Sequence, residues 1–245
     1  MNQSAKTAIV TGAGKRVGLA VSEFLAKRGW TVVAHVRRSE DAVPDGMVKV
    51  AADLADENCA ETIFAAAEGL APVRLLVNNA ARFAHDGFGS FSTEEFERHI
   101  GVNLRAPLLL GEALSKRHDP GEEALIVNIL DSKLAAPNPD FVSYTLSKQG
   151  LAGLTELSAR AYAGQGIRVN AIAPALMLRS PGQSEANFQA THERNPLHRG
   201  VRPDDVVRAL DYLINAPAVT GEILTIDSGQ RFEPPPRDPQ YLEVE

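Results

Sequence analysis

Near its N-terminus the chain carries the segment Thr7-Ala8-Ile9-Val10-Thr11-Gly12-Ala13-Gly14-Lys15-Arg16-Val17-Gly18. Residues 7–10 are apolar or β-branched and predict a short buried strand, whereas residues 16–28 carry apolar side chains at helical spacing. The glycines between them predict a tight turn, which lets backbone approach a phosphate at the N-terminus of a helix. We therefore expect phosphate contacts from Thr11, Gly12, Gly14, Lys15, Arg16, Val17 and Gly18.

The same alternation of short apolar runs and longer amphipathic runs continues along the chain. It predicts strands at 7–10, 31–35, 47–50, 75–77, 125–129, 167–172 and 222–226, and helices at 16–28, 56–70, 93–117, 144–163 and 204–215. Pro107 lies inside one predicted helix and is expected to kink or split it. The pattern predicts the α/β class, as a single doubly wound Rossmann-type domain with a mostly parallel sheet of about seven strands flanked by helices.

Two segments lack this periodicity. Residues 175–203 are long for a connection within one domain, which favours a lid or substrate loop. Residues 232–245 are rich in proline and predict a tail that is ordered only where something docks it. We therefore expect a Rossmann-type domain at 1–231 and a C-terminal tail at 232–245.

Composition excludes several classes of protein. The chain has 245 residues and a net charge of −6, which argues against a general nucleic-acid binder. It has one cysteine and no apolar run of membrane-spanning length, so we expect a cytoplasmic protein that does not interact with membranes. Its six histidines lack zinc-binding spacing, and we expect no metal.

The end of the second predicted strand indicates which dinucleotide is preferred. NAD sites usually place a carboxylate about 20 residues after the glycines, where it holds the ribose 2′-hydroxyl. This chain has Arg37, Arg38 and Ser39 there instead. Guanidinium groups bind phosphate through paired donors, so the sequence favours NADPH/NADP+ with its 2′-phosphate.

A tyrosine and a lysine on one predicted helix suggest proton transfer. Tyr144 and Lys148 are four positions apart and therefore share a helix face. A lysine cation is expected to favour the phenolate and to lower the tyrosine pKa from about 10 towards the working range. The pair suits proton transfer coupled to hydride transfer.

These motifs together resemble the short-chain dehydrogenase/reductase family, from Thr7 to about Gly229. The glycine motif is TGxxxGxG in that family, and Arg16 replaces its middle glycine here. The resemblance implies that Asp53, with Leu54, contacts adenine and that Asn103 holds a water in a proton relay. It further implies cofactor contacts from Asn79, Ala80, Tyr144, Lys148 and Pro174, and a homotetramer or dimer through the helices at 93–117 and 144–163.

Three positions resemble the pteridine reductase branch of the family. They are Arg16, Phe83 after the Asn78-Asn79-Ala80 motif, and Asp131 where the family usually has serine. The resemblance implies that Phe83 stacks on a pterin and that Asp131 assists protonation of a ring nitrogen. The catalytic set is then Asp131, Tyr144, Lys148 and Asn103, and the substrate contacts are Arg16, Phe83, Asp131, Tyr144 and Leu176.

Three functions remain open on the sequence alone. The first is NADPH-dependent reduction of a dihydropterin or dihydrofolate. The second is reduction of an ordinary carbonyl compound, with Asp131 or the neighbouring Ser132 on the substrate oxygen. The third is a dinucleotide-binding sensor without catalysis, against which the intact Tyr144 and Lys148 argue.

Overall fold

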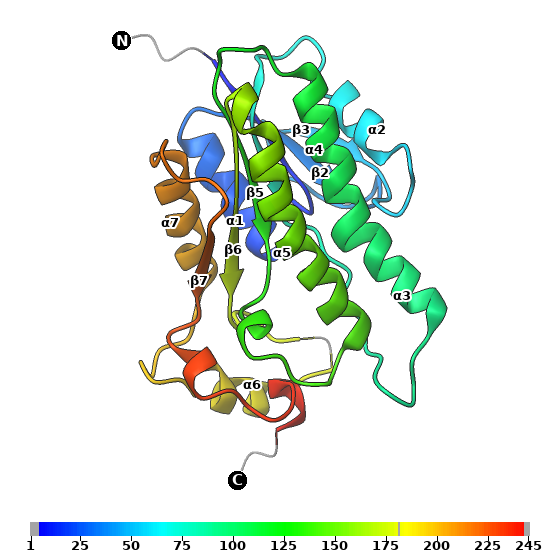
Figure 1. The fold of residues 1–245 in the computed structure, drawn as a ribbon, viewed down its shortest axis with the longest axis vertical. Helices are drawn as coiled ribbons and strands as arrows, with labels where there is room; N and C mark the ends of the chain where they lie inside the picture. The colour runs from blue at the N-terminus through cyan, green and yellow to red at the C-terminus, as the bar shows by residue number, and fades with distance from the viewer. Residues whose placement is uncertain (1–4, 181, 243–245) are drawn as a thin grey trace.

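The computed structural model describes residues 5–180 and 182–242, and it is built on one seven-stranded parallel sheet (Figure 1). The strand order is β3-β2-β1-β4-β5-β6-β7. The strands are β1 (Thr7–Val10), β2 (Thr31–Val36), β3 (Val48–Ala51), β4 (Val73–Asn78), β5 (Ala124–Ile129), β6 (Ile167–Pro174) and β7 (Ile223–Ile226). All seven predicted strands are present and the Rossmann-type fold is confirmed; the sheet is parallel throughout.

Helices cover both faces of this sheet. They are α1 (Arg16–Lys27), α2 (Cys59–Ala65), α3 (Thr93–Ile100), α4 (Ala106–Arg117), α5 (Val142–Tyr162), α6 (Glu185–His192) and α7 (Pro203–Ile214). Alternate residues of β1 point to opposite cores, as expected for a strand buried on both faces. Ile9 packs with α2, α4 and α5, whereas Ala8 and Val10 pack with α1 and α7.

The helix predicted at 93–117 is divided as expected near Pro107. α3 passes into a π-helical turn at Gly101–Arg105, and Pro107 then lies in the first turn of α4. Proline has no N–H to donate to the carbonyl four residues earlier, so it is tolerated where a new helical segment begins. The helix predicted at 56–70 is shorter than expected. α2 ends at Ala65 because the following backbone N–H groups bond three residues back, as from Ala67 to Phe64.

The segment 175–203 is not entirely irregular, since α6 lies within it. Ser184 caps this helix by accepting a hydrogen bond from the Asn187 N–H. A short 3₁₀ turn at Gln230–Phe232 leads into the tail, and a second at Pro239–Tyr241 lies within it. The boundary between the predicted domain (1–231) and the predicted tail (232–245) stays a prediction. Residues 1–4 and 181 of that domain and residues 243–245 of that tail lie outside the described residues.

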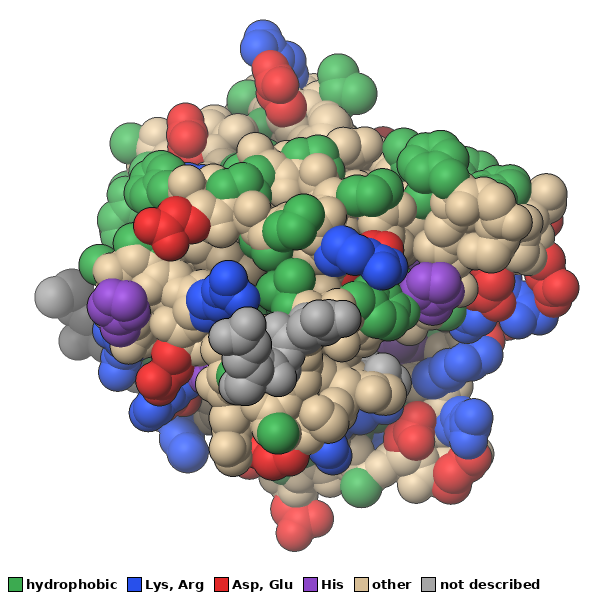
Figure 2. All heavy atoms as spheres, turned by 90° about the horizontal axis from the view of Figure 1, so that it is seen from below, with side chains coloured by type: hydrophobic (Ala, Val, Ile, Leu, Met, Phe, Trp, Pro, Cys, Tyr) green, Lys and Arg blue, Asp and Glu red, His purple; other side chains and the backbone are tan. Residues whose placement is uncertain are grey.

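The carboxyl ends of all seven strands point towards α6 and the C-terminal tail (Figure 1). Ligands of open α/β sheets bind at this edge, where the strand order reverses between β1 and β4. Figure 2 looks onto this end of the molecule, where hydrophobic side chains lie among basic, acidic and histidine side chains. None of the helices in the described part of the chain has the length and hydropathy needed to span a membrane.

Candidate active site

A cleft of about 980 Å³ runs along the carboxyl ends of the strands. It extends from β2 and β3 past the glycine turn to the start of α5. Most of the residues predicted from the sequence line it: Gly12, Gly14, Lys15, Arg16, Val17, Arg37, Asp53, Leu54, Asn79, Ala80, Phe83, Asp131, Tyr144, Lys148, Pro174 and Leu176. The predicted residues Thr11, Gly18, Arg38, Ser39 and Asn103 are not among the lining residues.

The glycine turn is held by a buried histidine. Gly12, with a φ of +66°, donates its N–H to Nδ1 of His35 over 3.2 Å. The other ring nitrogen of His35, Nε2, lies 2.9 Å from the carbonyl oxygen of Ala52 and must donate to it. Burial lowers the pKa of His35, which keeps the ring neutral and able to accept from Gly12. The sequence alone did not indicate that His35 supports the glycine turn.

Thr11 and Gly18 support the turn from behind. The Thr11 hydroxyl accepts the N–H groups of Asn79 and Ala80 over 2.9 and 3.0 Å, which joins β1 to the turn after β4. A Cβ at Gly18 would lie 2.1 Å from the Gly12 carbonyl oxygen, so only glycine fits there. Both residues therefore support the turn, and their contact with a cofactor stays a prediction.

The residues present fit a dinucleotide phosphate. The first turn of α1 receives no side-chain cap, so its backbone N–H groups face the cleft with the helix dipole behind them. Lys15 and Arg16 add two cations at the same helix end. A Cβ at Gly14 would meet the Ala42 carbonyl oxygen at 2.5 Å, so the backbone there has no room for a larger residue.

The predicted 2′-phosphate site is partly assembled. Arg37 lines the cleft and donates from Nε to Asp53 over 3.2 Å, which holds the guanidinium at the end of β2. The backbone N–H of Ala55, more than Arg37, lowers the pKa of Asp53. Arg38 and Ser39 are exposed beside Glu40, outside the cleft lining. A direct cofactor contact is therefore better supported for Arg37 than for Arg38 or Ser39.

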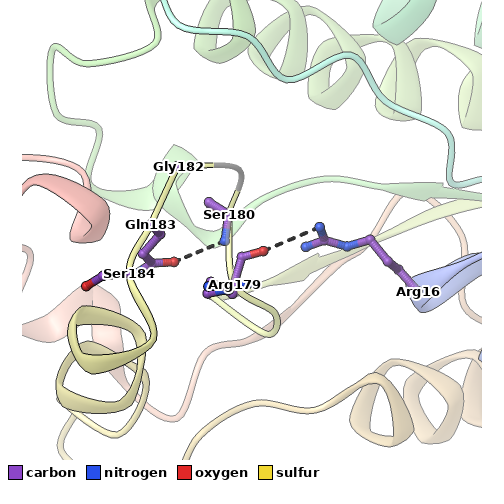
Figure 3. A pocket seen from close by; sticks show the side chains of 6 residues that line it. All are labelled: Arg16, Arg179, Ser180, Gly182, Gln183 and Ser184. Carbon is purple, nitrogen blue, oxygen red and sulfur yellow. Dashed lines mark hydrogen bonds between the residues drawn. The ribbon is translucent and has the colours of Figure 1, made fainter.

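Arg16 reaches from the glycine turn to the lid segment. Figure 3 shows its guanidinium directed at the Arg179 carbonyl, which accepts from Nη1 over 3.5 Å. Nη2 donates to the Leu178 carbonyl over 3.4 Å. Gln183 braces this segment by accepting the Ser180 N–H over 3.0 Å. Arg16 therefore connects the glycine turn with the segment after β6, beside a smaller hollow of about 440 Å³. A lid role for this segment stays a prediction.

The catalytic end of the cleft brings together three predicted side chains. The Tyr144 hydroxyl donates a hydrogen bond to Oδ2 of Asp131 over 2.9 Å. Lys148 Nζ donates to the Ile129 carbonyl over 2.6 Å, and it lies 5.9 Å from the centre of the Tyr144 ring. Tyr144 is 8% exposed and Lys148 is 2% exposed, so the pair is shielded from bulk water. Ser132 also lines the cleft, but Asp131 bonds the phenol.

The pKa of Tyr144 is shifted upwards, whereas the sequence led us to expect a downward shift. Burial raises it well above 10, and the negative charge of Asp131 and the hydrogen bond to it raise it further. Burial lowers the pKa of Lys148 to about 8, so the lysine charge is itself disfavoured at this site. Tyr144 thus holds its proton and can donate it, and the expectation of a lowered Tyr144 pKa was wrong for these surroundings.

Asn103 lies behind the cleft and is fully buried. Its Oδ1 accepts the Arg82 N–H over 2.7 Å, and its Nδ2 donates to the Arg82 carbonyl and to Ser147 Oγ. These bonds join the loop after β4 to α5. The side chain therefore positions Phe83 and Tyr144, and a catalytic role for Asn103 stays a prediction.

Aromatic rings form one wall near Tyr144. Phe83 stacks on Phe141 with ring centres 4.3 Å apart and meets Tyr144 edge-on at 4.8 Å. Phe141 has a φ of +56°, an uncommon conformation for a bulky residue. Such strain persists only where the surroundings fix it, and here Phe83 and Tyr241 stack on the Phe141 ring.

The N-terminus of α5 is capped from a distant loop. Phe141 has no polar side chain to cap the helix, and Asp86 takes that role. Its Oδ1 accepts the Ser143 N–H over 3.0 Å, and its Oδ2 accepts the Ser143 hydroxyl. Asp86 is buried, so it fixes the helix end that carries Tyr144. Asp86 could not be identified from the sequence, because no local pattern pairs it with Ser143, 57 positions further along the chain.

Two charged residues at the catalytic end were also missed. Lys133, two residues after Asp131, lines the cleft, and burial lowers its pKa. Asp238 also lines the cleft, although it lies in the C-terminal tail, far from Asp131 in the sequence. The proline-rich composition identified a tail but gave no signal for where it docks.

Comparisons with known proteins show the family of the chain. Residues 6–190 match the family model described as short chain dehydrogenase. Carbonyl reductase (NADPH) 2 of Sus scrofa is 30% identical over 241 residues, which cover 94% of this chain and 98% of the relative. 3beta-hydroxysteroid dehydrogenase 1 of Eggerthella lenta is 31% identical over 247 residues, which cover 94% of this chain and 95% of the relative.

Two solved structures are similar over nearly the whole fold. FolM alternative dihydrofolate reductase 1 from Brucella canis, complexed with NADP, has a TM-score of 0.87 and 34% identity and covers 93% of this chain and 94% of its own. The Brucella suis protein of the same name, also with NADP, has a TM-score of 0.88 and 34% identity and covers 94% and 96%. The chain therefore belongs to the short-chain dehydrogenase family and is an NAD(P)-dependent oxidoreductase.

Proposed function

We propose that this enzyme reduces a pteridine, such as a dihydropterin or dihydrofolate, with NADPH. The observation that carries the proposal is the hydrogen bond from Tyr144 to Asp131 in the buried end of the cleft. A carboxyl group can accept from a ring N–H and, when protonated, donate to a ring nitrogen. The FolM reductases from Brucella, which are dihydrofolate reductases by name, support the same substrate class.

The residues divide the reaction between them. NADPH bound in the cleft would supply the hydride that reduces the carbon of the C=N bond. Tyr144, whose pKa is raised, keeps its proton and delivers it to the ring nitrogen directly or through Asp131. Lys148 holds the strand end through the Ile129 carbonyl and compensates negative charge that develops on the phenol. Phe83 offers an aromatic face for a flat heterocycle.

The preference for NADPH over NADH is part of the proposal. Arg37 lies in the cleft at the end of β2, where a guanidinium can bind the 2′-phosphate. Its ion pair with Asp53 keeps it in place at 3.2 Å. The names of similar proteins support this preference: the name of the Sus scrofa carbonyl reductase specifies NADPH, and the Brucella structures contain NADP.

A side-by-side assay tests the substrate class. The purified enzyme is given NADPH with dihydrobiopterin, dihydrofolate, a simple ketone and an acetoacetyl thioester, and NADPH oxidation is followed. We expect turnover of at least one of the two pteridines with a higher kcat/KM than either carbonyl compound. Turnover of the carbonyl compounds with none of either pteridine would reject the proposal.

Carbonyl reduction is the second candidate, and one observation favours it. Ser132 is buried beside Asp131 and lines the same cleft, so a hydroxyl is available for a substrate oxygen. The carbonyl reductase of Sus scrofa supports this alternative. A Ser132→Ala variant separates the two: it would abolish ketone reduction under the alternative and leave pteridine reduction largely intact under the main proposal.

Assembly and location complete the proposal. Leu108 on α4 and Leu146 and Leu157 on α5 are exposed, which suits pairing of these helices between copies in a homotetramer or dimer. We expect the enzyme to act in the cytoplasm, where NADPH is available. Sedimentation of the purified protein distinguishes a monomer from these assemblies.

A further inference from the structure

The C-terminal tail is fixed across the substrate end of the cleft by hydrogen bonds from Arg237 and Asp238 to Asp140, which we call the latch. Arg237 donates from Nε and Nη2 to the two carboxylate oxygens of Asp140, over 3.2 and 2.7 Å. The backbone N–H of the next residue, Asp238, donates to the same carboxylate over 2.8 Å. The hydrogen bond from Arg237 lowers the pKa of Asp140. Asp140 lies just before α5, so the latch joins the tail to the element that carries Tyr144.

Two further contacts fix the tail on the C-terminal side of Asp238. The Tyr241 ring stacks on Phe141 with centres 5.9 Å apart and nearly parallel planes. The Leu242 carbonyl accepts a hydrogen bond from Asn187 of α6 over 2.8 Å. The tail is therefore held by the lid helix and by the aromatic wall, and its backbone has little freedom at Asp238.

The latch directs the Asp238 side chain into the cleft. Asp238 is half-buried and lines the cleft that also contains Asp131 and Tyr144. Gln240 N–H donates to Oδ1 over 3.2 Å, and the ion pairs among the described residues do not include Asp238. Burial raises the pKa of Asp238; the hydrogen bond from the Gln240 N–H and the charge of Lys133 act against this rise, and the charges of Asp131 and Asp140 add to it. Among the described residues, Gln240 N–H is the one hydrogen-bond donor to this carboxylate, so acceptor capacity remains for a ligand in the cleft.

We propose that Asp238 is a specificity-determining residue that binds the amino-amide edge of the substrate heterocycle. Two adjacent N–H donors on a flat ring match the two oxygens of a carboxylate. A pterin carries such donors, a ring N–H and a 2-amino group, on the pyrimidine ring, at the far side from the reduced C=N bond. The ring would then lie between Asp131 with Tyr144 at one end and Asp238 at the other.

This inference rests on the proposed function and narrows it. A ketone or thioester offers only acceptors to Asp238, and a carboxylate repels an acceptor oxygen. The tail would therefore favour nitrogen heterocycles over simple carbonyl compounds, although both could reach Tyr144. Discrimination of this kind comes from a site built to pair with donors, which rejects a ligand that lacks them.

The test compares two ligands that differ at one substituent. The probes are pterin, with a 2-amino group, and lumazine, with a 2-oxo group, titrated by fluorescence into the enzyme saturated with NADP+. We expect pterin to bind the wild-type enzyme at least about 10-fold more tightly than lumazine, as a charge-assisted hydrogen bond implies. Asp238→Asn keeps an acceptor for Gln240 and should reduce the preference to about 3-fold or less.

Two further variants make the result specific to the cleft carboxylate. Glu233→Gln removes one charge from an exposed part of the same tail and should keep the full preference. Arg237→Gln releases the latch without removing the Asp238 carboxylate, and it should lower the preference as Asp238→Asn does. NADP+ binding is measured for every variant, and we expect it to be unchanged because the latch lies at the substrate end.

The outcomes separate this inference from the proposed function. Reduction of dihydrobiopterin combined with an undiminished pterin preference in Asp238→Asn would overturn the role of Asp238 and leave the function standing. A pterin preference that depends on Asp238, without any pteridine turnover, would support the role of Asp238 and reject the proposed function. If the wild-type enzyme shows no preference for pterin, or if Glu233→Gln loses it equally, the inference is wrong.

Discussion

Removing the distant cap of α5 should destabilise the protein and reduce catalysis together. The change is Asp86→Ala, which deletes the carboxylate that accepts both the N–H and the hydroxyl of Ser143. Both residues are buried, at 2% and 0% exposed, so water cannot replace the lost partners without opening the structure. Tyr144 follows Ser143 directly and depends on this helix end for its position.

The size of the effect follows from the groups left without partners. Loss of an N-terminal cap costs about 1 kcal/mol, and a buried donor left unsatisfied costs about 1–3 kcal/mol. Together they give a loss of about 2–4 kcal/mol in the free energy of unfolding. For a chain of this length each kcal/mol lowers Tm by about 2–4 °C, so we expect Tm to fall by roughly 5–15 °C.

Urea unfolding and thermal unfolding measure the first effect, and steady-state kinetics measure the second. Asp45→Ala, on an exposed loop, is the matched control and should stay within about 0.5 kcal/mol of the wild type. Ser143→Ala removes the hydroxyl but keeps the N–H bond, so its loss should be smaller than that of Asp86→Ala. An Asp86→Ala protein with wild-type stability and activity would refute the capping argument.

Three further predictions concern the cofactor and the lysine. Arg37→Ala should weaken NADPH binding at least about 10-fold more than NADH binding, and equal losses in fluorescence titrations would contradict a 2′-phosphate contact. His35→Leu leaves the Gly12 N–H without its acceptor, and we expect NADPH to bind about 5–30-fold more weakly; an unchanged Kd would exclude this role. Because burial lowers the Lys148 pKa to about 8, the lysine is fully charged only below that pH, so kcat/KM should decline above about pH 8. Lys148→Arg should move this decline to higher pH, and an unmoved profile would assign it to another group.

Local patterns were sufficient to predict most of the fold. The strands of this sheet are short apolar runs between amphipathic helices, so the sequence pattern alone indicates where each element lies. Pro107 likewise acts through its own backbone. α6 was not predicted because eight residues with a weak apolar stripe do not stand out; Ser184 at its start was the available signal.

The candidate site was predictable where a motif fixes the spacing. Tyr144 and Lys148 share one helix, so the sequence spacing alone places them near each other. The residues of the glycine turn are consecutive in the sequence and are close together for the same reason. Asp86, Asp238 and the His35–Gly12 bond depend on tertiary contacts that no local pattern encodes. The direction of the Tyr144 pKa also depends on burial and on Asp131, and spacing to Lys148 alone does not determine it.

The central claim is that the Tyr144 phenol supplies the substrate proton beside a bound nicotinamide. The most direct measurement is single-turnover oxidation of NADPH by Tyr144→Phe with the best substrate of the wild-type enzyme, together with the Kd of NADPH. We expect the rate to fall by roughly 100-fold or more, as loss of a general acid does, with an unchanged Kd. An unaltered rate with normal NADPH binding would contradict the account.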